Sequence, residues 1–166
     1  MLTYYNIQYL LQNISSTRVS AVVSEELVLA ISQEPRKECP LLVPEGFGPL
    51  AGVRVVSSGI LIAQPFAAYM AALWGAEVIH VERPGGDTYR YSPPFMESSE
   101  GRVNTWWAQE RRNVLSIVVD LRKDRGKEVF LRLLRQADIW MESSMPGTQK
   151  LGITDELAHK VNPQLV

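Results

Sequence analysis

Hydrophobic and polar positions in the middle of the chain predict one strand–helix–strand unit. Residues 53–56 form a short apolar run rich in β-branched side chains, which indicates a buried strand. Residues 66–74 are apolar almost all round, which predicts a buried helix. Pro65 suits the first turn of that helix and Gly75 suits its C-terminal cap. Residues 77–82 predict a second strand, parallel to the first through a right-handed crossover.

The remainder of the chain continues this alternation of strands and helices. Residues 114–121 predict a third strand and residues 138–142 a fourth. Between them, residues 124–136 place their apolar side chains in one stripe, the pattern of an amphipathic helix. A last helix is expected up to Val161, with Thr154 as its N-cap. The pattern predicts an α/β fold with a mostly parallel, Rossmann-like sheet flanked by helices.

Residues 91–109 show no regular hydrophobic period and contain Pro93-Pro94, so they are predicted to form a loop. The adjacent Trp106 and Trp107 fit the cover of a pocket, a subunit contact or ordinary core packing.

The first 46 residues are interpreted as an extension or linker outside the regular pattern. Residues 25–31 predict two turns of helix after Ser24, and residues 33–44 contain three prolines and four charges, as linkers do. One interpretation is an extra docking segment or the tail of a preceding domain. We favour the other, an appendage with little fixed structure.

Composition narrows the classes of function. A chain of 166 residues is one domain or a piece of one, and a net charge of −1 offers no attraction to nucleic acid or an anionic membrane. The single cysteine, Cys39, excludes an internal disulfide framework and fits a reducing compartment. We see no membrane-spanning run and no secretory signal, so a cytoplasmic location is expected. His80 and His159 lie on separate elements, and no metal site is expected.

Two loops qualify as ligand loops, residues 57–64 and 83–90, because ligands of open α/β sheets lie beyond the carboxyl ends of strands. Gly59 stands alone in the first loop, which argues against a dinucleotide turn. Arg83 follows the second strand in a Gly-rich loop, and a guanidinium suits adenosine phosphates. The alternative is a solvated arginine paired with Asp87, and we favour the ligand role.

Several motifs occur in a fixed order along these elements: GVRVV at residues 52–56, A-x-P at 63–65, WGAEVI at 74–79, and E-x-P-G-G-D-x-x-R at 82–90. With them, residues 47–166 resemble the N-terminal, CoA-binding part of class III CoA-transferases, the CaiB/BaiF type, in incomplete form.

The resemblance implies coenzyme A or acyl-CoA as the bound molecule and suggests its contacts. Residues just before the A-x-P proline line the CoA site through their backbone, and the strand end at residues 119–122 borders the adenine. In the loop after the fourth strand, Met145 replaces a basic residue or glycine that many members carry. The implied binding residues are Ile62, Ala63, Arg83, Val119, Arg122, Ser143, Ser144 and Lys150.

The resemblance also implies a reaction, the movement of CoA between an acyl-CoA and a carboxylic acid. Residues 137–144 and 151–166 favour the carnitine or bile-acid branch. The nucleophile is then an aspartate beyond Val166, used in covalent catalysis, and the full-length protein is an interlocked homodimer. The alternatives are an α-methylacyl-CoA racemase and a truncated, non-catalytic module that binds CoA or a partner protein.

Overall fold

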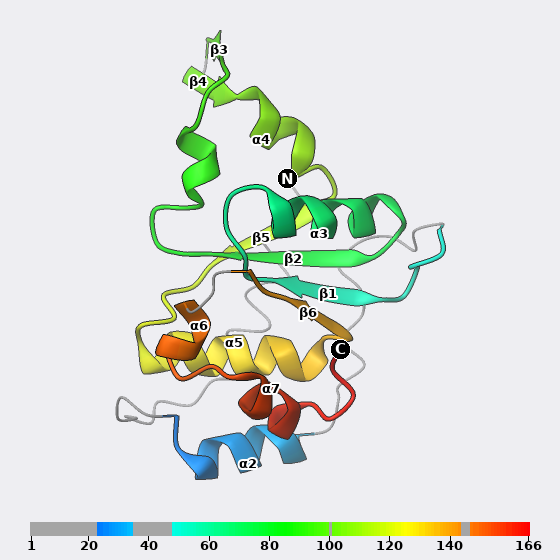
Figure 1. Ribbon diagram of the computed structural model, residues 1–166, viewed down its shortest axis with the longest axis vertical. Coiled ribbons are helices and arrows are strands. Elements are labelled where there is room, and N and C mark those ends of the chain that lie inside the picture. The colour runs from blue at the N-terminus through cyan, green and yellow to red at the C-terminus, as the bar shows by residue number, and fades with distance from the viewer. Residues whose placement is uncertain (1–22, 35–47, 100, 144–146) are drawn as a thin grey trace.

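A parallel four-stranded sheet forms the centre of the computed structural model, which describes residues 23–34, 48–99, 101–143 and 147–166. The strand order is β5 (Val114–Val118), β2 (Glu77–Glu82), β1 (Arg54–Ser57) and β6 (Ile139–Met141). Helix α3 (Ala63–Leu73) covers one face of the sheet and α5 (Asp124–Gln136) covers the other (Figure 1). The predicted α/β class with a parallel sheet flanked by helices is confirmed.

Alternation along the strands divides the apolar side chains between two cores. Val55 and Val78 are partners in the β1–β2 register and pack with Ala68 of α3. Their neighbours Val56 and Ile79, also register partners, belong to a larger cluster on the α5 side of the sheet. Both faces of each strand are therefore buried, as expected of parallel strands between helices.

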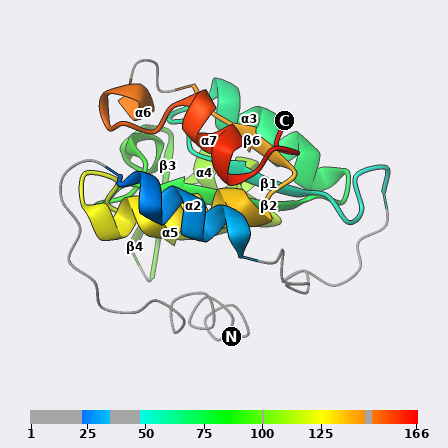
Figure 2. The same ribbon diagram turned by 90° about the horizontal axis from the view of Figure 1, so that it is seen from below.

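A further helical layer lies outside α5, formed by α7 (Asp155–Val161) and α2 (Glu25–Gln33) (Figure 2). Each helix begins with a side-chain cap: Ser24 accepts a hydrogen bond from the backbone N–H of Leu27 at 3.2 Å, and Thr154 accepts one from Leu157 at 3.2 Å. Both caps are those expected from the sequence.

Helix α2 differs from the interpretation of residues 1–46 as an appendage with little fixed structure. Its Val28 and Ile31 belong to the same buried cluster as Phe130 of α5, and Ile31 is fully buried. Residues 24–34 are thus part of the folded core. Residues 1–22 and most of the expected linker, with Cys39, lie outside the described residues.

The prediction of a loop over residues 91–109 is wrong. A 3-10 helix η1 (Thr88–Tyr91) leads into an antiparallel hairpin, β3 (Phe95–Ser98) and β4 (Gly101–Asn104), and then into α4 (Thr105–Glu110). Asn104 organises this region: its side chain accepts a hydrogen bond from the Trp107 N–H at 2.8 Å and donates one to the Ser92 carbonyl at 2.6 Å. Polar side-chain hydrogen bonds, such as the cap by Asn104, hold this region in place. A hydrophobic repeat does not mark it, so the sequence pattern did not predict these elements.

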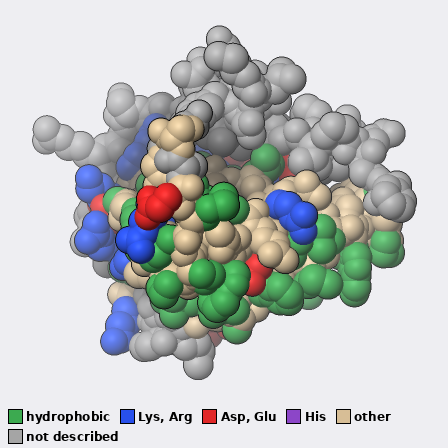
Figure 3. Space-filling model, turned by 90° about the horizontal axis from the view of Figure 1, so that it is seen from above, with side chains coloured by type: hydrophobic (Ala, Val, Ile, Leu, Met, Phe, Trp, Pro, Cys, Tyr) green, Lys and Arg blue, Asp and Glu red, His purple; other side chains and the backbone are tan. Residues whose placement is uncertain are grey.

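The composition of α3 predicted a helix that is buried on all sides, but the structure shows that one side is exposed. Phe66 and Leu73 are 41% and 44% exposed, and Trp74 at its C-terminal cap is 54% exposed. Viewed from above, the molecule shows hydrophobic side chains gathered on its surface (Figure 3). A helix on one face of a sheet buries only the side turned to the strands, and within the described residues no element covers the outer side of α3.

No helix in the described ranges combines the length and the apolar character that crossing a membrane requires.

Replacing Ile31 by alanine tests whether α2 belongs to the core. We expect Ile31→Ala to lower the free energy of unfolding by about 3 kcal/mol, because it leaves a cavity beside Phe130. Leu29→Ala is the matched control, since Leu29 is 58% exposed on the same helix and should change the value by less than about 0.5 kcal/mol. Urea unfolding measures both. Equal values for the two variants would mean that α2 does not stabilise the domain.

Candidate functional site

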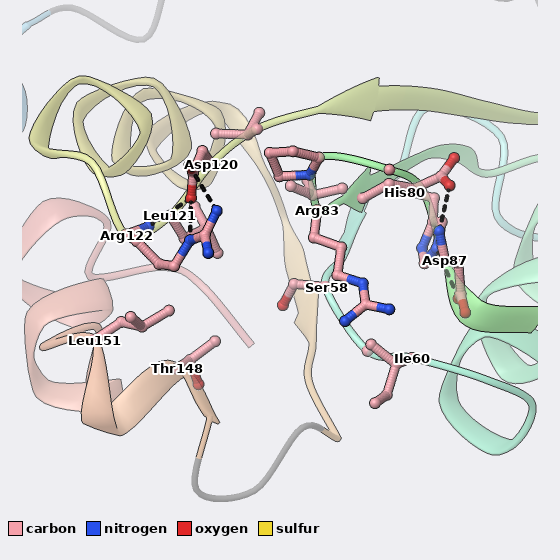
Figure 4. Close-up of a pocket in the computed structure, with 16 residues that line it drawn as sticks. Ser58, Ile60, His80, Arg83, Asp87, Asp120, Leu121, Arg122, Thr148 and Leu151 are labelled. Carbon is pink, nitrogen blue, oxygen red and sulfur yellow. Dashed lines mark hydrogen bonds and ion pairs between the residues drawn. The ribbon is translucent and has the colours of Figure 1, made fainter.

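A cavity of about 420 Å³ lies beyond the carboxyl ends of the strands (Figure 4). Its volume is in the range of small-molecule sites. The loops after β1, β2 and β5 and the short helix α6 (Gly147–Lys150) with the residue that follows it enclose the cavity. Its wall consists of Ser58, Gly59, Ile60, His80, Val81, Glu82, Arg83, Pro84, Gly85, Asp87, Val119, Asp120, Leu121, Arg122, Thr148 and Leu151.

The strand order explains why the cavity forms at this edge. From β1 the chain crosses to β2 through α3 on one face, whereas it returns from β5 to β6 through α5 on the opposite face. After β6 the chain continues to α7, which packs on α5, so the connections that leave β1 and β6 run to opposite faces and make a topological switch point between these neighbouring strands. Such points leave a crevice that the strands themselves cannot fill.

Arg83 extends from the loop after β2 into the cavity (Figure 4). Its Nε donates to the carbonyl oxygen of Gly86 at 3.3 Å, and within the described residues its guanidinium forms no ion pair. Asp87 does not pair with it: the Asp87 carboxylate accepts hydrogen bonds from other groups. A cation without a carboxylate partner, set in a cavity wall, suits an anionic ligand.

Arg122 reaches the same cavity from the loop after β5 but is already paired. Its Nε and Nη2 donate to the two carboxylate oxygens of Asp120 at 2.8 and 3.0 Å, which lowers the pKa of Asp120. Gly126 lets the first turn of α5 approach this loop, because a Cβ there would lie 2.0 Å from the Asp120 carbonyl oxygen. An anion would meet Arg122 on the edge that Asp120 leaves open, or would compete with that carboxylate.

Of the other residues expected from the sequence, only Val119 lines this cavity, where it forms part of the apolar wall. Ile62 and Ala63 are exposed at the start of α3 and Ser143 is exposed after β6, all outside the wall. Lys150 lines a second cavity, of about 410 Å³, between α5 and α7. Ser144 lies outside the described residues.

The structure adds wall residues that sequence reasoning did not select. Ser58 lies within the predicted ligand loop after β1, so its position at a strand end was the available signal. Thr148 and Leu151 come from α6 and the turn after it, where attention to charged side chains favoured Lys150 instead.

A buried carboxylate, Glu82, anchors the loop that carries Arg83. It accepts hydrogen bonds from Arg90 Nε at 2.7 Å, from the Asp87 backbone N–H at 2.9 Å and from Ser116 Oγ. Burial alone would raise the pKa of Glu82, but these hydrogen bonds outweigh it and lower the pKa from 4.5 to about 2. Arg90 in turn lies 3.9 Å over the Trp107 ring, so the loop is joined to α4.

Asp87 links this loop to the loop after β1. Its carboxylate accepts hydrogen bonds from the backbone N–H of Tyr89 at 2.9 Å and of Leu61 at 3.3 Å. Its second oxygen faces His80 Nε2 at 3.6 Å, and His80 Nδ1 lies 2.9 Å from Ser57 Oγ. Burial raises the pKa of Asp87, but the interactions with His80, Tyr89 and Leu61 outweigh burial and hold the pKa below its usual value. The two ligand loops are thus held as one unit.

No cluster of three or more His, Cys, Asp or Glu side chains suited to a metal occurs among the residues that the structure describes.

Comparison with known proteins identifies the family. Residues 50–166 match the model of CoA-transferase family III, and the chain belongs to this family. A CaiB/BaiF family protein from Brucella suis is similar, with 33% sequence identity and a TM-score of 0.66 over 73% of this chain. Rv3272 from Mycobacterium tuberculosis is similar at 34% identity, with a TM-score of 0.63 over 72% of this chain. The chain spans about a third, 32%, of each of these two structures.

The low pKa of Glu82 predicts an acid-dependent loss of stability. Because the folded pKa is below the unfolded one, the contribution is complete above about pH 5 and is lost as pH falls toward 2. We expect the wild-type advantage over Glu82→Gln in unfolding free energy to shrink by about 1–2 kcal/mol between pH 6 and pH 3, a figure reduced because Arg90 is partly exposed.

Urea unfolding at pH 6, 4 and 3 measures this difference. Glu97→Gln removes an exposed carboxylate from β3 and controls for the loss of one negative charge. An advantage over Glu82→Gln that stays constant across this pH range would contradict the role of Glu82.

Proposed function

We propose that this chain binds the CoA portion of an acyl-CoA in the cavity and thereby serves an enzyme that moves CoA between an acyl-CoA and a carboxylic acid. Family membership and the position of the cavity support the proposal. The observation that carries it is the guanidinium of Arg83, which extends into the cavity and is without a carboxylate partner among the described residues.

The wall offers two kinds of surface that match a nucleotide. Arg83 and the open edge of Arg122 provide cations, and a planar guanidinium can donate two parallel hydrogen bonds to one phosphate. Val119, Leu121 and Leu151 provide apolar surface, suited to an uncharged ring such as adenine. In this arrangement the chain holds and orients the ligand.

For the whole protein we propose a carnitine- or bile-acid-like acceptor and an interlocked homodimer. The acceptor proposal rests on the resemblance of residues 137–144 and 151–166 to the carnitine and bile-acid branch, and the homodimer proposal rests on the resemblance to the family as a whole.

A calorimetric titration with free CoA tests the binding proposal. We expect a dissociation constant below about 1 mM, and an increase of at least about tenfold in Arg83→Ala, because one charge-assisted phosphate contact is lost. Arg102→Ala is the matched control, since Arg102 is an exposed arginine on β4, outside the cavity wall, and its removal should leave the affinity unchanged.

A folded wild-type chain that binds CoA more weakly than 1 mM would remove the binding proposal and favour a module that contacts another protein. An Arg83→Ala variant that binds like wild type would leave CoA binding in place but would remove the role of Arg83.

A further inference from the structure

The hydroxyl of Ser58 lies in the cavity wall and is held by two fixed partners. Ser58 is the first residue after β1, is 8% exposed, and donates its backbone N–H to the Met141 carbonyl at 3.0 Å. Its Oγ is 2.8 Å from Trp140 Nε1 and 2.6 Å from Glu142 Oε2. Figure 4 shows the side chain pointing into the cavity.

The chemistry of these partners decides the direction of both hydrogen bonds. An indole N–H can only donate, so Ser58 Oγ accepts from Trp140. An ionised carboxylate can only accept, so Ser58 donates its single proton to Glu142. A hydroxyl has one proton and two lone pairs, and this network uses the proton and one lone pair. One acceptor lone pair remains, on a side chain that faces the cavity.

We propose that Ser58 is a specificity residue that accepts a hydrogen bond from an N–H or O–H group of the bound ligand. The inference rests on the proposed function and deepens it. Phosphate oxygens are acceptors and are excluded from Ser58, because two acceptors without a proton between them repel each other. The phosphate oxygens bind Arg83 and Arg122 instead. The wall thereby sets the orientation of the ligand in the cavity.

CoA carries suitable donors in two parts of the molecule: the adenosine part, with the amino group of adenine and the ribose 2′-hydroxyl, and the pantetheine arm, with its amide and hydroxyl groups. Adenosine 3′,5′-bisphosphate contains only the first part. Comparing the two ligands therefore locates the donor that Ser58 recognises.

The experiment measures the affinities of wild type, Ser58→Ala and Trp140→Phe for both ligands by calorimetry. We expect Ser58→Ala to weaken CoA binding about five- to twentyfold, because the ligand donor loses its acceptor. Trp140→Phe is the matched control: it disturbs the same network but keeps the Ser58 oxygen, so its affinity should change less than twofold.

Ser58→Cys provides a second variant of nearly the same shape, whose sulfur is a weak acceptor, and it should weaken binding as Ser58→Ala does. Melting temperatures of all variants show whether each is folded.

Weaker binding of CoA alone in the Ser58 variants supports a donor in the pantetheine arm, and weaker binding of both ligands supports one in the adenosine part. Unchanged CoA affinity in a folded Ser58 variant overturns the inference, as does a Trp140→Phe variant that loses as much affinity as Ser58→Ala. Absence of CoA binding by wild type overturns the proposed function and this inference together.

Discussion

A carboxylate buried at the end of β2 must be paired, and the edge of the domain that carries the cavity depends on how Glu82 meets this requirement. Uncompensated burial of a charge is costly, so the chain brings Arg90, Ser116 and the Asp87 N–H to one side chain. These bonds close the loop that carries Arg83. They also place Arg90 against Trp107, so the loop, the neighbouring strand and α4 are connected in one frame.

The cavity depends on this frame and on the topological switch point between β1 and β6. The switch point opens a crevice, and the loops that meet there contribute different chemistry: cations from the ends of β2 and β5, apolar side chains from β5 and α6, and an oriented hydroxyl from β1. An asymmetric wall of this kind can distinguish the two ends of a ligand such as CoA. In the proposed complex, the orientation of CoA would follow from the positions that the fold gives to these groups.

The sequence was most informative where either a hydrophobic period or a local cap marks an element. The strand at residues 77–82 and the helix at 124–136 appear with their expected bounds, and Ser24 and Thr154 cap the helices that they were expected to cap. It was least informative where polar side chains at a distance organise the chain. Asn104 builds the region after η1 through bonds to Ser92 and Trp107, and no periodic signal marks it.

By itself, the sequence determined the α/β class, the family resemblance and two of the loops that line the cavity, because strand and helix periods and strand-end position are local properties. Only the tertiary structure decided which side chains share the cavity. Ser58 and Arg122 come from two separate loops and Thr148 comes from α6, whereas Lys150 faces another cavity although it is close to Thr148 in the chain. The direction of a side chain depends on packing between distant elements, and so does the hydrogen bond from Ser116 of β5 to Glu82.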